Sequence, residues 1–233
     1  MKRSIFFVAF VFALAMASDF AMGQSVTKES RNVSGFTKVS FGISGNMYIN
    51  IGNEYKVTLE GDKDDIEDVI TEVSGGRLVV KKDNWNMNFN EKVTVYITMP
   101  ELEGLGVSGS GKAEIKDAVK TNDLNLSVSG SGKLYASEVT VSDLKCSISG
   151  SGDIILGGGN ASTADLSISG SGNYTGETTK LGSADISISG SGNCVVNVTE
   201  SLKAGVSGSG DVTYIGNPKV DARVSGSGKV RSR

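Results

Sequence analysis

The tetrapeptide Ser-Gly-Ser-Gly occurs seven times at a nearly constant spacing. The copies begin at Ser108, Ser129, Ser149, Ser169, Ser189, Ser207 and Ser225, so the steps are 21, 20, 20, 20, 18 and 18 residues. Two units are almost identical: residues 164–173 read ADLSISGSGN and residues 184–193 read ADISISGSGN. A period of this length is typical of solenoids, in which each repeat is one coil stacked on the next.

Apolar and polar residues alternate on both sides of each motif. The residue before the first serine is always apolar: Val107, Val128, Ile148, Ile168, Ile188, Val206 and Val224. So is the residue two positions earlier: Leu105, Leu126, Cys146, Leu166, Ile186, Ala204 and Ala222. After the motif, the same parity gives Ala113, Leu134, Ile154, Tyr174, Cys194, Val212 and Val230. A period of two indicates strands with one buried face.

Each unit therefore contains a strand, the Ser-Gly-Ser-Gly element, a second strand and a short return. Twenty extended residues cover at most ~66 Å, enough for one turn of a flattened coil. We predict an all-β fold, a right-handed parallel β-solenoid (β-helix) of about 20-residue coils, in which equivalent residues stack into ladders ~4.8 Å apart. A leucine-rich repeat has a similar period but needs a helical segment in its second half, where this chain alternates again.

The region before the repeats predicts an N-terminal cap. Val39, Phe41 and Ile43, then Met47, Ile49 and Ile51, alternate around a degenerate motif at residues 44–46 and indicate a first coil. Residues 55–59, 78–82 and 92–99 are expected to be strands, whereas the apolar spacing over 64–73 predicts a short helix ended by Gly75 and Gly76. We expect one domain over residues 36–233, with irregular capping coils to residue 100 and repeats from 101, after a linker over 24–35.

The first 23 residues have the features of a signal peptide. Lys2 and Arg3 precede an apolar run from Ile5 to Ala17, and Ala21 and Gly23 suit cleavage before Gln24; cleavage after Ala17 fits less well. No other run of ~18 apolar residues is present, so no membrane span is expected. We therefore expect an exported protein, located in the periplasm, at the cell surface or outside the cell.

Composition excludes several functions. Cleavage removes Lys2, Arg3 and Asp19 and leaves 21 basic and 25 acidic residues, a net charge of −4, which disfavours nucleic acid as a partner. The chain has no histidine, the commonest acid, base or metal ligand near neutral pH. We assign no catalytic, metal or cofactor-binding residues and expect no cofactor.

The Ser-Gly-Ser-Gly motif does not indicate a phosphate-binding loop. It lacks the Lys-Ser/Thr ending of that loop and no helix follows it. Gly109 and Gly111 occupy inward positions, where the absence of a side chain permits a sharp bend. The serines are expected to form an exposed hydroxyl ladder, either solvated or used as a docking strip.

Aspartates among the repeats raise the question of catalysis. The position after the motif holds Lys112, Lys133, Asp153, Asn173, Asn193, Asp211 and Lys229. Asp153 and Asp211 are three coils apart, ~14 Å by the ladder spacing, which exceeds the carboxylate separation of glycosidases. A second column holds Asp165, Asp185 and Asp221 with Lys203 among them, so we favour solvated charge ladders over a catalytic pair. Trp85, Met87 and Phe89 extend the core or, if exposed, stack against sugars; burial is favoured.

The two cysteines are expected to be free. Cys146 and Cys194 lie on different strands of coils two apart, which alone separates them by ~9.6 Å along the axis. A disulfide requires Cα atoms within about 7 Å. Both cysteines occupy inward columns, where cysteine acts as a small apolar residue.

The signal peptide, the Met-Pro-Glu-Leu segment at residues 99–102, the repeated Val/Ile-Ser-Gly-Ser-Gly and the Gly-Asn-Pro at 216–218 together resemble a bacterial family. That family is described as putative auto-transporter adhesin, head GIN domain, and the resemblance runs from Phe36 to the end of the chain. It implies a β-solenoid fold and no defined functional residues. Since no translocator barrel follows residue 233, we do not expect a self-contained autotransporter.

Two functions are compatible with these features. The favoured one is a non-catalytic envelope or surface protein, adhesive or structural, that binds a glycan or envelope protein through a solenoid face and can form oligomers through its ends. The alternative is a carbohydrate-active β-helix enzyme, a polysaccharide lyase or hydrolase. Calcium dependence and acids clustered in one groove would favour the enzyme.

Overall fold

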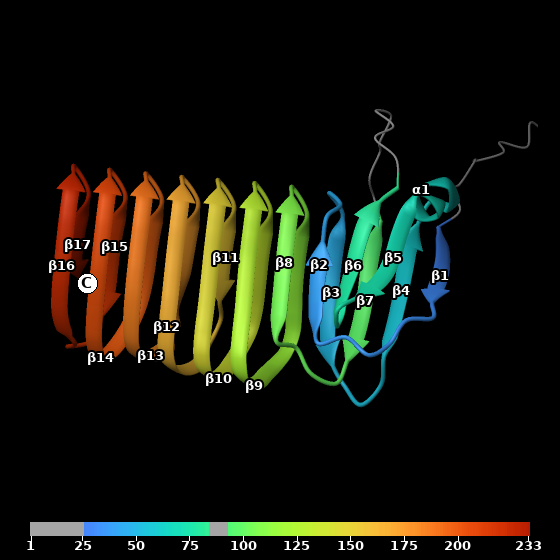
Figure 1. The fold of residues 1–233 in the computed structure, drawn as a ribbon, viewed down its shortest axis with the longest axis horizontal. Coiled ribbons are helices and arrows are strands. Elements are labelled where there is room, and N and C mark those ends of the chain that lie inside the picture. Colours follow the sequence, from blue (N-terminus) through green and yellow to red (C-terminus); the bar gives the residue numbers. More distant parts are fainter. Residues whose placement is uncertain (1–25, 84–92) are drawn as a thin grey trace, which may run out of the picture.

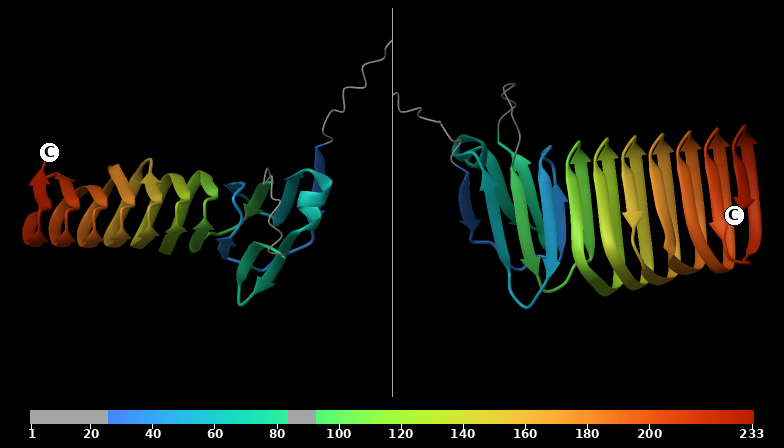
Figure 2. Two further views of the ribbon diagram at one scale, coloured as in Figure 1. Left: turned by 90° about the horizontal axis from the view of Figure 1, so that it is seen from above. Right: turned by 180° about the vertical axis from the view of Figure 1, so that it is seen from behind.

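The computed structural model describes residues 26–83 and 93–233. The chain is a parallel β-solenoid of about six turns, as the repeat predicts, with little helix. The coils lie side by side along the long axis, and a cap closes the N-terminal end (Figure 1). Figure 2 shows the same stack from above and from behind. The predicted signal peptide and the Trp85–Phe89 segment fall outside the described residues.

The regular coils are built from ten strands. These are β8 (Gly104–Gly109), β9 (Lys112–Gly130), β10 (Lys133–Gly150), β11 (Asp153–Leu156), β12 (Gly159–Gly170), β13 (Asn173–Gly190), β14 (Asn193–Gly208), β15 (Asp211–Ile215), β16 (Lys219–Gly226) and β17 (Lys229–Ser232). Each pairs in parallel with its equivalents in the neighbouring coils, so that Ile148 lies beside Ile168 and Ile168 beside Ile188, and β16 and β17 end the stack. The predicted ladders are confirmed.

The inward columns form one continuous core. In the column that precedes the motif, Val107 to Val206 are at most 3% exposed, and Leu134, Ile154 and Tyr174 after the motif are at most 1% exposed. The last coil differs, because every residue of β16 is exposed and Val224 retains 44% of its surface. The core is therefore covered along its length and open at the C-terminal end.

The two glycines of each motif serve different purposes. The first has a positive φ, +114° at Gly150, which other residues rarely adopt. The second is buried: a Cβ on Gly152 would lie 2.4 Å from Val128 Cγ1 and 2.5 Å from the carbonyl oxygen of Gly132. The bend at the motif is thus as predicted, but the inward placement of Gly109 was wrong. Gly109 is exposed, because the chain turns there before the strand resumes its alternation.

The cap contains a coil that is out of sequence order. β2 (Lys38–Phe41) lies between β6 (Arg77–Lys82) and β8, while β3 (Asn46–Ile51) lies between β7 (Thr94–Met99) and β9. The degenerate motif stacks on the first complete one, since Lys112 N donates to Gly45 O at 3.0 Å. The first coil of the chain is therefore an inner coil, and a later coil covers it.

The outer end of the cap is antiparallel. β4 (Lys56–Gly61) pairs with β7, and β1 (Thr27–Arg31) pairs with β4. β1 lies within residues 24–35, where we expected a linker, so that part of the segment is ordered sheet. Arg31 Nη2 donates to the carbonyl oxygen of Ile66 at 2.9 Å and ties this strand to the neighbouring helical turn.

The helix expected over residues 64–73 is mostly a strand. Only α1 (Lys63–Glu67) is helical, and β5 (Val69–Ser74) forms an antiparallel hairpin with β6. Gly75 and Gly76 have φ values of +56° and +72°, the two positive angles of a tight hairpin turn. The glycines that we interpreted as a helix stop instead connect two strands.

Cys146 and Cys194 are free and buried, as expected. Burial in apolar surroundings raises the pKa of both thiols well above the ordinary range. The thiolate, which is the reactive form, is therefore strongly disfavoured in the folded protein.

We predict that neither thiol reacts with a small disulfide reagent in the native protein. Both should react after denaturation without reductant, which a colorimetric thiol count on the two states would measure. Isolation of a peptide that links Cys146 to Cys194 from native protein would contradict the coil register.

Candidate functional site

A groove of about 680 Å³ runs along the solenoid axis across five coils. Its lining repeats from coil to coil: Asp123, Leu124, Asn125, Asp143, Leu144, Lys145, Thr163, Ala164, Asp165, Ser183, Ala184, Asp185, Ser201 and Lys203. We call this surface the axial groove. Parallel pairing stacks Asp143 on Asp123 and Thr163, and Asp165 on Lys145 and Asp185.

Strand alternation explains why the axial groove is polar. Each coil contributes residues from a stretch of three consecutive positions to the groove, such as Asp123, Leu124 and Asn125. The middle residue of each stretch is buried, so the residues on either side of it point outward and form two columns on the surface. The buried column narrows to alanine at Ala164 and Ala184. The axial groove therefore presents carboxylates, hydroxyls and ammonium groups at intervals of about one coil, ~4.8 Å.

Most of these polar groups are paired within the axial groove. Lys203 donates to Asp185 at 2.6 Å, Lys145 lies 3.7 Å from Asp165, and Ser201 donates to Ser183 at 2.8 Å. The hydrogen bond to Asp185 and its charge raise the pKa of Lys203. Two lysines thus balance two of the four carboxylates, and Asp123 and Asp143 leave the N-terminal part of the groove negative.

The spacing of Asp165 and Asp185 invites comparison with glycosidases. They occupy adjacent coils, ~4.8 Å apart by the ladder spacing, close to the separation in retaining enzymes. A catalytic acid must be free to reach the glycosidic oxygen of its substrate, whereas here each aspartate is held by a lysine, Asp165 by Lys145 at 3.7 Å and Asp185 by Lys203 at 2.6 Å. The sequence placed both in one column, but we did not foresee that the column borders a groove.

The column after the motif forms a hydrogen-bonded ladder. Lys133 pairs with Asp153 at 2.8 Å, Asn173 donates to Asp153 at 3.0 Å, and Asn193 donates to Asn173 at 3.1 Å. Further along, Asp211 accepts from the backbone N–H of Lys229 at 2.9 Å. Partial burial pushes the pKa of Asp153 up, but the hydrogen bonds from Lys133 and Asn173 outweigh it and hold the pKa below its usual value.

This ladder matches the predicted charge ladder. Asp153 and Asp211 are separated by two intervening asparagines, three coils apart as expected. Their separation is unsuited to a catalytic pair.

A tyrosine cluster lies where the cap meets the first regular coils. The rings of Tyr48 and Tyr96 stack with centroids 5.7 Å apart, and the ammonium of Lys116 lies 4.8 Å from the Tyr48 centroid. Tyr135, two coils from Tyr48, is 38% exposed. A hollow of about 200 Å³ is lined by both Tyr48 and Tyr135.

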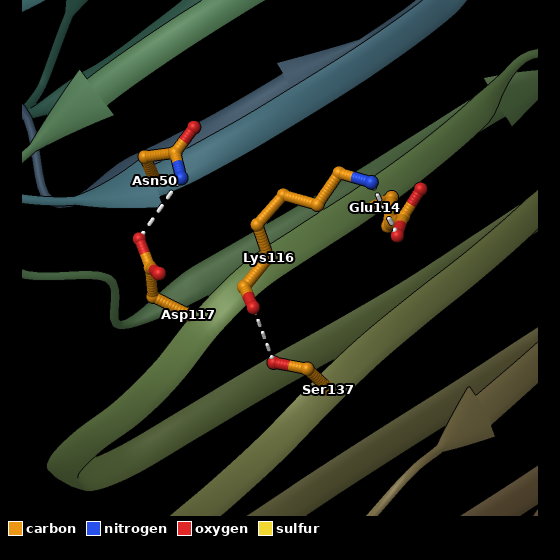
Figure 3. A network of polar contacts seen from close by, with 5 residues as sticks. All are labelled: Asn50, Glu114, Lys116, Asp117 and Ser137. Atoms are coloured by element: carbon orange, nitrogen blue, oxygen red, sulfur yellow. Dashed lines mark hydrogen bonds and ion pairs between the residues drawn. The ribbon is translucent and has the colours of Figure 1, made fainter.

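A polar network beside the tyrosines joins the cap to the coils (Figure 3). Asn50, on β3, donates to Asp117 at 3.0 Å, and Lys116 pairs with Glu114 at 2.7 Å. Ser137, on the next coil, donates to the carbonyl oxygen of Lys116 at 2.8 Å. The bond from Asn50 joins the cap to β9, and the bond from Ser137 joins β9 to β10, so the network links the cap to the first coils through β9.

Two features are absent within residues 26–83 and 93–233. No group of three or more His, Cys, Asp or Glu side chains there could hold a metal ion. No helix in the same ranges is long and apolar enough to cross a membrane.

Fold and surface together define a capped β-solenoid that displays ladders of polar side chains and an axial groove. Its family follows from the sequence: the chain belongs to the family described as putative auto-transporter adhesin, head GIN domain, whose model matches residues 35–218. This confirms the resemblance found in the motifs. No curated protein matches the chain.

Several crystal structures have the same fold. A putative adhesin from Bacteroides fragilis is 24% identical, with a TM-score of 0.84 over 91% of this chain and 98% of that one. A putative lipid binding protein from Parabacteroides distasonis is 22% identical, with a TM-score of 0.74 over 89% and 96%. A putative adhesin from Parabacteroides merdae is 21% identical, with a TM-score of 0.73 over 89% and 96%. At these identities the likeness shows the fold alone.

Proposed function

We propose that this protein is an exported, non-catalytic adhesin-like protein that binds a linear glycan along the axial groove. The observation that carries the proposal is the groove itself, with polar groups repeated at each of five coils. The coil spacing is comparable to the length of one sugar ring in an extended chain. A polymer lying along the axis would therefore meet an equivalent donor or acceptor at each ring.

The charge of the groove restricts which classes of glycan can bind there. Asp123 and Asp143 have no lysine between them in the stacked column, so the groove carries excess negative charge near β9 and β10. A polyuronate would be repelled there, whereas a neutral or amino-sugar polymer would not. The family and the signal-peptide features support export and a surface role.

The arrangement of charges supports binding over catalysis. In the axial groove, Lys145 and Lys203 form ion pairs with the adjacent aspartates. In the column after the motif, the carboxylates form hydrogen bonds with their neighbours in the ladder. These carboxylates already have partners within the protein, whereas a catalytic acid must reach the glycosidic oxygen of its substrate.

Binding should be tested with residues 24–233 on an array of neutral, amino-sugar and uronic-acid polymers. We expect binding to neutral or amino-sugar chains and none to polyuronates. Ser183→Arg, which fills the groove, should weaken binding at least tenfold, whereas Ser169→Arg, at an exposed motif serine outside the groove, should leave it unchanged.

Three results would overturn the proposal. Equal binding by the Ser183→Arg and Ser169→Arg variants would place the ligand elsewhere. Binding to polyuronates alone would contradict the charge argument. Release of reducing ends from a bound glycan, lost in Asp165→Asn or Asp185→Asn, would establish the enzyme alternative.

A further inference from the structure

The C-terminal end of the solenoid is an open sheet edge. β16 pairs only with β14, and β17 pairs only with β15. Within the described ranges no other strand covers them, so their outer N–H and C=O groups face solvent. An unpaired edge of this kind is a template for another strand.

The side chains of β16 continue the core columns of the interior. Leu202, Ala204 and Val206 on β14 are 1–3% exposed, but their stacked partners on β16 are not covered: Val220 is 39% exposed and Val224 is 44% exposed. The inward face of β16 therefore lacks one further layer, which another strand would supply.

The sequence of β16 is self-complementary when two copies run antiparallel. Opposed residues in an antiparallel pair share a face, so inward residues must meet inward residues. A pair centred on Ala222 sets Val220 opposite Val224 of the second copy, and Asp221 opposite its Arg223, each contact occurring twice. Opposite charges and apolar pairs placed this way stabilise a sheet.

The neighbouring registers are unfavourable. A pair centred on Asp221 opposes two aspartates and sets Lys219 against Arg223, and a pair centred on Arg223 opposes two guanidinium groups. A shift by a single residue points the valines outward. Charged residues often protect edge strands from pairing, but here the order of the charges selects one register rather than opposing all of them.

Among the described residues, the same end of a second copy offers the matching edge. At the N-terminal end, β1 and β5 each pair on one side only among the described residues; the five residues Thr-Lys-Glu-Ser-Arg of β1 carry no large apolar side chain, and β5 belongs to the hairpin with β6. Head-to-tail stacking on β1 would therefore set the valines of β16 against charge. Contact between two C-terminal ends is isologous and closes after two copies.

We propose that the protein forms a twofold dimer in which β16 of one copy pairs antiparallel with β16 of a second copy, centred on Ala222. The β17 strand contributes only four residues, so β16 sets the register. The two solenoids then form one longer rod, with caps at its outer ends and the axial grooves of both copies exposed.

Sedimentation velocity on residues 24–233 over a range of concentrations tests the proposal. We expect a monomer–dimer equilibrium that shifts to monomer in Arg223→Asp, where Asp221 then opposes an aspartate. Arg223 is chosen for the single change because it stacks on Gly205 of β14, which has no side chain. The new aspartate therefore meets no side chain at that position of β14. The double variant Asp221→Arg/Arg223→Asp should recover the dimer, since each pair is again of opposite charge.

Asp165→Arg is the matched control, because Asp165 lies in the same column as Asp221 but on an interior coil. It should dimerise like the parent protein, and all variants should keep the parent's circular dichroism spectrum. A monomeric parent at every concentration would overturn the proposal. So would a dimer that survives Arg223→Asp, or a folded double variant that stays monomeric.

Discussion

Ile168→Asp should prevent the solenoid from folding. Ile168 is 2% exposed and stacks between Ile148 and Ile188 in the ladder before the motif. A carboxylate there would lie among apolar side chains with no cation or donor within the column. Burying an unpaired charge costs about 4 kcal/mol or more, a large part of the stability of a single domain.

Ser167→Asp provides the control for this change. Ser167 is one residue away in the same strand, but it is exposed and stacks between Ser147 and Ser187. An aspartate there remains hydrated, so its effect on stability should be within about 0.5 kcal/mol. Thermal melts followed by circular dichroism would compare the variants. Equal Tm values would show that the inward and outward assignments are wrong.

Gly172→Ala should also destabilise the protein strongly, although it adds only one methyl group. The Cβ would lie 2.3 Å from the carbonyl oxygen of Gly152 and 2.5 Å from Ile148 Cγ2. Backbone and a packed β-branched side chain both have to move, and each contacts the next coil. Overpacking of this kind costs roughly 3 kcal/mol.

Gly158→Ala is the matched substitution without the clash. A Cβ there meets only the carbonyl oxygen of Ser137 at 3.8 Å, an ordinary contact. The urea midpoint of Gly158→Ala should stay near that of the parent, while that of Gly172→Ala should fall clearly. Equal midpoints would mean that the coils can separate at the motif at little cost.

The sequence predicted the coils well because their physical basis is local and repeated. Alternation identifies the buried face of each strand, and a constant period fixes which residues stack, so Ile148, Ile168 and Ile188 could be aligned by counting. The free cysteines followed from the same count. Apart from the inward placement of Gly109, errors arose where the repeat stops.

In the cap, the local pattern was ambiguous. Ile66, Val69, Ile70 and Val73 have helical spacing, but pairing with β6 makes a strand of the last three, and Gly75–Gly76 suits a hairpin turn as well as a helix stop. The out-of-order coil has no local signature, because alternation in β2 and β3 reveals a buried face but not the neighbouring strand. Only tertiary packing decides it.

The axial groove could not be predicted from the sequence, for a related reason. The columns through Asp143 and Asp165 could be counted, and their polarity was evident. That these columns enclose a hollow, lined also by Ala164 and Ala184, depends on the three-dimensional course of the strands. The period and polarity of the sequence alone do not determine this course.

The near identity of residues 164–173 and 184–193 has a consequence for folding and for evolution. Either segment could occupy the position of the other with almost the same contacts. The repeats alone therefore do little to favour correct stacking over stacking that is shifted by one coil. The cap supplies a unique starting template on which coils can add in order. The same interchangeability means that duplication or loss of one 20-residue unit in the gene would lengthen or shorten the rod without redesigning any interface.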